Sequence, residues 1–297
     1  VFRLARAMGA SNRWIIVLVL LTVIHPVVSS SSRIAAPETL LTLVVLVLVR
    51  LLTNSTTVSL QLAGLVAGLS VSLHPRAIIF PIALFFVSIS YKRARVAIVG
   101  LLPGLGITFL ALIATGTIPT MRVAAASSIG SSPNVIQVAA GQILLIAVAT
   151  AGLGFHALYQ GACGLYRSKL QAPKSPVLSF LFLCSIGMTI LGSWVLADSE
   201  QSDVLLYGRY LDPVLVSLVA VIVASPLLQQ IKRKAVLVSA LLTFVSFLIV
   251  FNGAASAPLP GRRIMTLSVS IFWWLGNGSL FPAALFALFF VRTSLAV

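Results

Sequence analysis

Ionisable residues are scarce in this sequence, and two of them stand together in the stretch Tyr207-Gly208-Arg209-Tyr210-Leu211-Asp212-Pro213, just before a long apolar run. A guanidinium group can bind two phosphate oxygens at once. A carboxylate can orient hydroxyl groups or help to hold a metal ion. Charged residues at the mouth of an apolar segment are functional-site candidates by default. The stretch therefore predicts a polar binding site, with Arg209, Tyr210 and Asp212 as candidates.

Similar isolated charges occur at two earlier points of the chain. Arg33 follows four serines and precedes Pro37-Glu38, and His74-Pro75-Arg76 separates two apolar runs. Arginines beside apolar grooves suit the phosphate of a membrane lipid. We therefore expect Arg76 and Arg209 to bind a lipid-linked phosphate with support from Arg33. Glu38, His74 and Asp212 are the candidates for polar contacts or for a divalent metal ion.

Each of these residues also has a structural alternative. Arg209 and Asp212 are spaced to pair along a helix, and His74-Pro75-Arg76 can simply be a tight turn with Arg76 reaching for headgroups. Glu38 suits the positive end of a helix that starts at Pro37. Tyr210 is also typical of an aromatic belt at a membrane interface. These alternatives remain open at the level of the sequence.

Composition predicts the kind of fold that would position such a site. Of the 297 residues, 59% are apolar and only 8% are charged, and the mean hydropathy is +1.11. A soluble chain of this length needs more charge to cover its surface. We therefore expect one all-α integral-membrane domain over residues 1–297, a polytopic bundle of transmembrane helices.

Apolar runs predict about eleven membrane spans. The last two are the least distinct, because no basic loop separates them. Gly64 and Gly68 form a pair of small residues, which predicts a close helix contact. The spans are expected near residues 14–28, 39–52, 58–74, 77–91, 96–114, 135–159, 176–197, 211–228 and 235–251, then through Phe272-Trp273-Trp274 and from about residue 280.

Charge placement predicts which face is cytoplasmic. Alternating spans put 13 of the 20 basic residues on one face, which the positive-inside rule assigns to the cytoplasm. All five acids fall on the other face. The net charge of +15 is therefore explained by basic residues that set the orientation in the membrane, and nucleic-acid binding is not expected. The 13 residues are Arg3, Arg6, Arg13, Arg50, Lys92, Arg93, Arg95, Arg167, Lys169, Lys174, Lys232, Arg233 and Lys234.

The order of these features resembles the GT-C superfamily of integral-membrane glycosyltransferases, which includes dolichyl-phosphate-mannose protein mannosyltransferases and bacterial aminoarabinose transferases. The resemblance covers nearly the whole chain, but each motif is short. It is carried by Arg3-Leu4-Ala5-Arg6, Ser32-Arg33 with Pro37-Glu38, His74-Pro75-Arg76, and Gly208-Arg209-Tyr210-Leu211-Asp212-Pro213.

This resemblance implies transfer of a sugar from a polyprenyl-phosphate donor to a glycan, lipid or protein acceptor, at the extracytoplasmic face of the plasma membrane. The family carries its catalytic carboxylate in a loop between its first two spans. The chain is expected to begin after that loop, so the base is expected outside it. No cofactor is implied with certainty, although a divalent metal ion is one option.

Two other functions fit the same sequence. A transporter or lipid flippase would use the charges to line a path, but such proteins usually show internal repeats, and none is visible here. A non-catalytic remnant of a glycosyltransferase is the third reading. The ionisable residues gather at one face, which favours the enzyme.

Overall fold

The computed structural model describes residues 37–54, 56–115, 134–150, 152–167, 175–196, 210–224 and 233–255. Every element in these ranges is a helix, which confirms the all-α prediction there. The elements are α4 (Pro37–Asn54), α5 (Thr57–Ser70), the short 3-10 helix η1 (Pro75–Ile78), α6 (Ile79–Ser90), α7 (Ala94–Ala114), α9 (Asn134–Ala149), α10 (Leu153–Arg167), α11 (Ser175–Leu196), α12 (Asp212–Ala224) and α13 (Arg233–Ala255).

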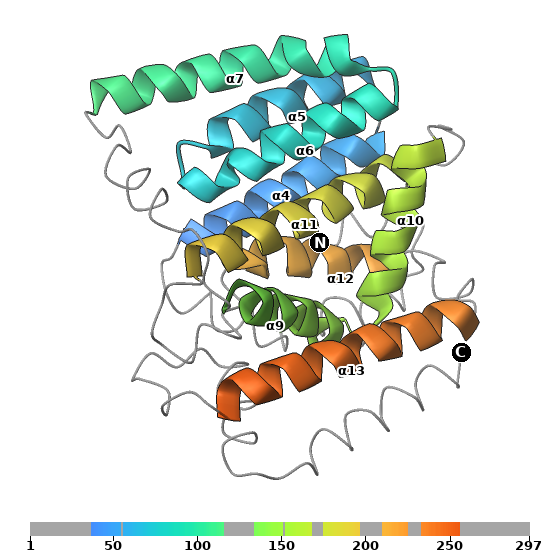
Figure 1. Cartoon of the computed structure of the whole chain (residues 1–297). Helices are drawn as coiled ribbons and strands as arrows, with labels where there is room; N and C mark the ends of the chain where they lie inside the picture. Colours follow the sequence, from blue (N-terminus) through green and yellow to red (C-terminus); the bar gives the residue numbers. More distant parts are fainter. Residues whose placement is uncertain are drawn as a thin grey trace.

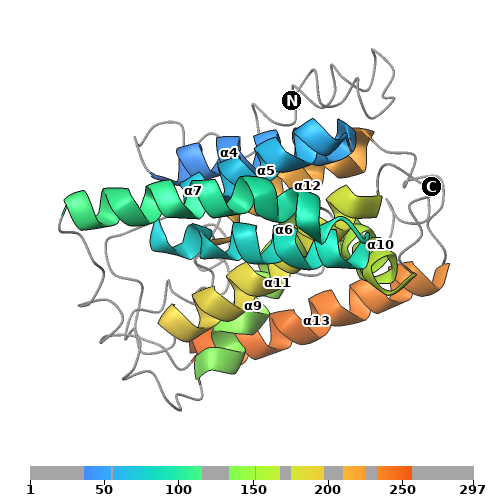
Figure 2. The same cartoon turned by 90° about the horizontal axis from the view of Figure 1, so that it is seen from above.

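The helices pack as a bundle in which most axes run side by side (Figure 1 and Figure 2). Short turns join α4, α5, α6 and α7, so these four helices alternate in direction. α11 packs against α6, α9 and α10, α12 packs against α4, and α13 packs against α9. α10 crosses the others steeply (Figure 1). The arrangement gives the bundle two distinct ends.

We name the two ends after the arginine that each contains. The Arg76 end holds η1, the end of α11 and the beginnings of α4 and α12 (Figure 1). The Arg93 end holds the end of α4, the beginning of α5, the turn between α6 and α7, and the beginning of α11. Helices of alternating direction thus bring segments that are far apart in the sequence to the same end.

Glycines allow α5 and α7 to touch backbone to backbone. A Cβ atom added at Gly64 would lie 2.5 Å from the carbonyl oxygen of Ala97, and one added at Gly68 would lie 2.7 Å from the amide nitrogen of Leu105. Thr108 Oγ1 donates a hydrogen bond to the Gly68 carbonyl across this contact at 3.0 Å. The close contact predicted from the Gly64 and Gly68 pair is therefore confirmed.

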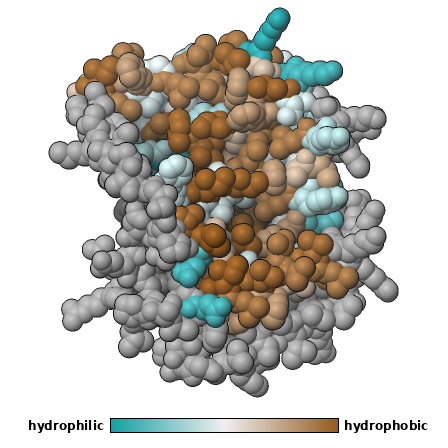
Figure 3. Space-filling model, in the orientation of Figure 1, coloured by the Kyte–Doolittle hydropathy of each residue, from teal (hydrophilic) through white to brown (hydrophobic). Residues whose placement is uncertain are grey.

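The core is apolar, and so is much of the described surface. Leu48, Phe80, Phe180 and Met188 are fully buried. Large apolar side chains are also exposed on α4, α5, α6, α7, α11 and α13. They make the face in Figure 3 predominantly hydrophobic. Surfaces of this kind are rare on soluble monomers and are typical of membrane or protein contacts.

Two helices are long and apolar enough to cross a membrane, namely Ala94–Ala114 and Pro176–Leu196. The helices predicted near 39–52, 58–74, 77–91, 211–228 and 235–251 are present as α4, α5, α6, α12 and α13, and apart from α13 they are at most 18 residues long. The first, tenth and eleventh predicted spans lie outside the described residues. An eleven-span bundle is therefore a proposal.

The sixth predicted span, near residues 135–159, was wrong as a single helix. The structure has α9 and α10 in its place, with a break between Ala149 and Leu153. Gly152 adopts φ 77°, a left-handed conformation that side chains other than glycine seldom adopt. Its N–H donates to the Ala147 carbonyl at 2.7 Å, and the Thr150 hydroxyl accepts from the Gly154 N–H at 2.9 Å. These bonds satisfy backbone groups that the interruption releases.

Candidate functional site

The candidate site at the Arg76 end begins with η1, whose local sequence explains its shape. Pro75 stands at the start of the helix, where its missing N–H has no cost. His74 caps the helix with an extended backbone, and its Nδ1 accepts a hydrogen bond from the Arg76 N–H at 3.2 Å. The Ala77 N–H donates to the His74 carbonyl at 2.9 Å. His74 is thus held in place by a structural bond, beside Arg76 in the chain.

Arg76 is the most unusual residue of this end. Its side chain is only 5% exposed, although it carries a guanidinium group in an apolar bundle. The guanidinium carbon lies 5.1 Å from the centre of the Tyr210 ring. Cations at this distance are attracted to the negative face of an aromatic ring, most strongly when water is excluded. The contact joins η1 to the segment before α12.

Asp212, at the beginning of α12, supplies a carboxylate two residues after Tyr210 in the chain. The Leu211 carbonyl accepts hydrogen bonds from the N–H groups of Val214 and Leu215, at 2.8 and 2.9 Å. Asp212 therefore lies in the first turn, where its negative charge complements the helix dipole. It is only 8% exposed. The helix start accounts for part of its role, and burial makes it a candidate for a ligand contact as well.

Sequence reasoning missed Gly192, which makes room for Tyr210. A Cβ atom added at Gly192 in α11 would lie 3.2 Å from both Cβ and Cγ of Tyr210. A larger residue at this position would press on Tyr210, the residue whose ring Arg76 faces. A glycine inside an apolar helix gives no sign of such a role, so only the three-dimensional packing identifies it.

The structure thus brings Arg76 and Tyr210 into contact, with His74 beside Arg76 and Asp212 beside Tyr210 in the chain. Arg33 and Arg209 lie outside the described residues. Glu38 is in the first turn of α4, and only its backbone is described. Within the described part of the chain, no three His, Cys, Asp or Glu residues gather in a way that suits a metal ion. The site is therefore best read as a buried cation with an aromatic partner and a nearby carboxylate.

No protein-family model matches the sequence, and neither a curated protein nor a solved structure matches it.

The cap role of His74 leads to a prediction about stability. Replacing His74 with Ala removes the acceptor for the Arg76 N–H and should lower the free energy of unfolding by about 1 kcal/mol, the usual size of a cap effect. His74→Asn keeps an acceptor at the cap and should retain most of that stability. Thermal unfolding of the purified chain in detergent, followed by circular dichroism, measures both. Equal losses in the two variants would show that the imidazole acts through something other than the cap.

Proposed function

We propose that this chain is a multi-pass membrane protein whose Arg76 end binds the phosphate of a polyprenyl-phosphate-linked sugar. The binding step would serve a glycosyl transfer of the GT-C kind, at the extracytoplasmic face of the plasma membrane. Two apolar helices of spanning length and a broad exposed apolar surface support the membrane setting. About eleven spans in a single domain belong to this proposal.

The observation that carries the proposal is the buried guanidinium of Arg76 against the Tyr210 ring. Burying a charge in an apolar environment is costly, which makes a buried arginine a candidate for a functional role. A guanidinium in such a place interacts far more strongly with an anion than it would in water. A phosphate group fits its fork of donors. The same contact would stabilise a departing lipid phosphate as its negative charge grows.

The orientation in the membrane follows from the other end of the bundle. Arg50, Lys92, Arg93 and Arg95 belong to segments at the Arg93 end, while Glu38 and Asp212 belong to helix starts at the Arg76 end. The positive-inside rule would place the Arg93 end in the cytoplasm. The Arg76 end would then face outward, where polyprenyl-linked sugars would be presented to acceptor glycans, lipids or proteins.

The described residues have roles in binding, and none is assigned as the base. His74 holds the backbone of η1 through Nδ1, so it positions Arg76. Arg76 would hold the phosphate, and the Tyr210 ring would fix the guanidinium from one side. Asp212 is available to orient a sugar hydroxyl. The transfer would also require a general base that activates the acceptor hydroxyl, and the carboxylates Glu38 and Asp212 are the candidates to bind a divalent metal ion.

Binding of polyprenyl phosphate is the experiment that tests this function. The full chain in lipid nanodiscs should unfold at a higher temperature when polyprenyl phosphate is added. Polyprenol of the same length should give no shift, because it lacks the phosphate. Release of polyprenyl phosphate from a polyprenyl-phosphate sugar then measures transfer. Equal shifts with the phosphate and the alcohol would contradict a phosphate site.

A transporter or lipid flippase is the second candidate, and the break between α9 and α10 favours it. Transporters often bind their substrates where helices are interrupted, because free backbone groups become available there. Gly152, with its left-handed backbone, marks such an interruption. Movement of a polyprenyl-phosphate sugar across vesicles that contain this chain, without any transfer of the sugar, would support this candidate over the enzyme.

A further inference from the structure

A second cationic site lies at the opposite end of the bundle, and it starts with the turn after α6. The Lys92 N–H donates to the Ile89 carbonyl at 2.9 Å, and the Arg93 N–H donates to the Ser88 carbonyl at 2.7 Å. This pair of bonds is a Schellman motif, which usually places glycine in the left-handed position. Here Lys92 occupies that position with φ 57°. A residue other than glycine is strained there, and such outliers concentrate at functional sites.

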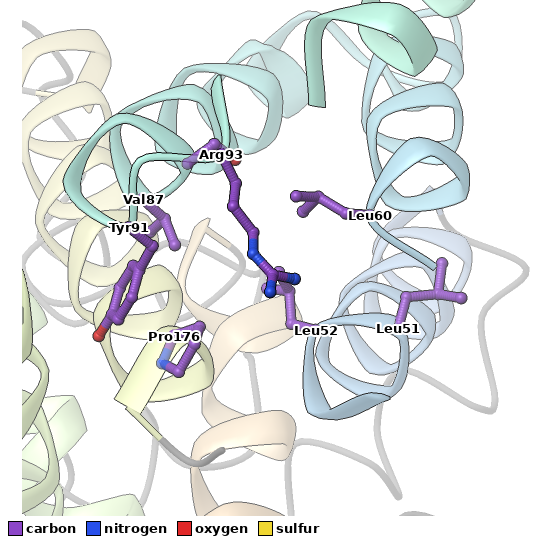
Figure 4. A pocket seen from close by; sticks show the side chains of 8 residues that line it. Leu51, Leu52, Leu60, Val87, Tyr91, Arg93 and Pro176 are labelled. Atoms are coloured by element: carbon purple, nitrogen blue, oxygen red, sulfur yellow. The ribbon is translucent and has the colours of Figure 1, made fainter. Parts of the chain in front are cut away.

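This turn directs the side chain of Arg93 into a pocket between helices. In Figure 4 the Arg93 side chain extends from the turn across the pocket, and its guanidinium lies beside Leu52. The space inside this partly open pocket is about 30 Å³, room for roughly two or three water molecules. A compact polar group fits inside, and a sugar ring or an acyl chain does not. The apolar walls come from Leu51, Leu52, Leu60, Val87 and Pro176.

Ser88 provides a second polar group in this pocket. Its side chain is 2% exposed and lines the pocket, and its hydroxyl has no hydrogen-bond partner among the described residues. A buried hydroxyl without a partner is destabilising, so a bound group that accepts its hydrogen bond would remove that destabilisation. Tyr91, the third polar residue, is already within 3.4 Å of the Ser179 hydroxyl, which donates to the Gly161 carbonyl at 2.8 Å.

The charge around the pocket selects an anion. Lys92 directly precedes Arg93 in the sequence, and it is exposed. Arg50 lies near the end of α4, one of the pocket's helices, and it donates to Asn54. Within the described ranges the acidic residues are Glu38 and Asp212, and both belong to the Arg76 end. The charge that the described residues place at the pocket is therefore positive.

The apolar surface next to the pocket indicates what carries that anion. α6 ends at the turn and exposes Ile82, Phe85, Phe86 and Ile89, at the spacing i, i+3, i+4 and i+7. This spacing gives one continuous apolar stripe along the helix. In the proposed membrane setting such a stripe faces acyl chains. A molecule with an anionic head and apolar tails matches both features, which free phosphate does not.

We infer that the Arg93 pocket binds the phosphate of an anionic phospholipid from the cytoplasmic leaflet. Arg93 and the Ser88 hydroxyl donate to the phosphate oxygens, Lys92 adds charge outside, and the acyl chains lie along α6. This site is separate from the Arg76 site, so it stands or falls independently of the proposed glycosyl transfer. Its role is to fix the cytoplasmic end of α4, α5, α6 and α7 to the membrane.

The test uses the full chain in nanodiscs with phosphatidylglycerol as the probe. Adding phosphatidylglycerol to phosphatidylcholine discs should raise the unfolding temperature of the native chain. Arg93→Gln should weaken the apparent affinity for phosphatidylglycerol about tenfold, as expected for loss of one charged hydrogen-bond partner. Arg95→Gln, at the exposed second residue of α7, is the matched control, and it should change the affinity less than twofold. Ser88→Ala should weaken the affinity severalfold without loss of stability in phosphatidylcholine discs.

Three results would overturn the inference. Equal losses in Arg93→Gln and Arg95→Gln would mean that charge is attracted over the whole surface without a defined pocket. An unchanged affinity in Ser88→Ala together with Arg93→Gln would place the lipid elsewhere. Stabilisation by inorganic phosphate at the same concentrations, with competition against phosphatidylglycerol, would identify free phosphate as the ligand.

Discussion

Arg76→Gln is expected to weaken the binding of polyprenyl phosphate by about 10- to 100-fold. A hydrogen bond to a charged group contributes about 1.5–3 kcal/mol, and each 1.4 kcal/mol is a tenfold change in affinity. Arg76 is 5% exposed, so water cannot replace the lost guanidinium well. Arg76→Lys should bind polyprenyl phosphate less tightly than the native chain and more tightly than Arg76→Gln. An ammonium keeps the charge but loses the planar fork of the guanidinium and its stacking on Tyr210.

The stability of the same variants separates a binding role from a structural one. Removal of one partner from a buried charged contact lowers stability, and Arg76→Gln removes the contact with the Tyr210 ring. Arg76→Gln should therefore unfold at a lower temperature than the native chain, whereas Arg76→Lys keeps the charge, should retain most of the stability and should still bind polyprenyl phosphate less tightly. Arg95→Gln is the control, since Arg95 is exposed near the opposite end of the bundle. Losses of binding and stability that run in parallel across Arg76→Gln and Arg76→Lys would instead indicate that this residue mainly supports the fold.

Gly100→Ala is expected to cost about 2 kcal/mol of folding free energy or more. A Cβ atom at Gly100 would overlap the backbone carbonyl of Gln61 in α5, and backbone atoms cannot rotate away as a side chain can. Overpacking typically costs about 1–3 kcal/mol. The better helix propensity of alanine returns up to about 1 kcal/mol. The helices would have to separate, which would also stretch the Thr108 hydrogen bond to Gly68.

Gly106→Ala is the matched control on the same helix. Apart from its chain neighbours and the backbone of its own helix, no heavy atom would lie within 4 Å of a Cβ at Gly106. The substitution should therefore be neutral or slightly stabilising. Denaturation in detergent with guanidinium chloride or heat, read by circular dichroism, compares the two variants directly. Equal stability of Gly100→Ala and Gly106→Ala would show that α5 and α7 are not in backbone contact.

The sequence predicted helices well where apolar runs end at polar or proline-containing turns. Thr56 accepts a hydrogen bond from the Ser59 N–H and starts α5, and Pro75 starts η1. The sequence therefore predicted where each of these two helices begins. The sequence did not predict the break at Gly152. The apolar run continues on both sides of it, and a single glycine does not reveal whether its backbone is left-handed.

The residues of the candidate site were predictable from the sequence, but their arrangement in space was not. Arg76 and Asp212 were predicted because they are isolated charges in an apolar chain, and such charges are costly to bury and usually functional. The contact between Arg76 and Tyr210 depends on the path of all the helices between them, which no local pattern specifies. Gly192 and Ser88 carry no sequence signal either. Their importance arises from what lies opposite them in the folded chain.

The unequal lengths of the helices have a consequence for the bilayer itself. α5 has 14 residues and α7 has 21, and the two begin at the same end of the bundle. At 1.5 Å per residue, α7 extends about 10 Å beyond the point where α5 stops and η1 begins. Lipids beside η1 would meet a short hydrophobic wall, and a bilayer thins locally to match such a wall. In the proposed orientation the outer headgroups would dip toward Arg76. A lipid-borne phosphate would then reach this arginine without leaving the depth at which headgroups normally lie.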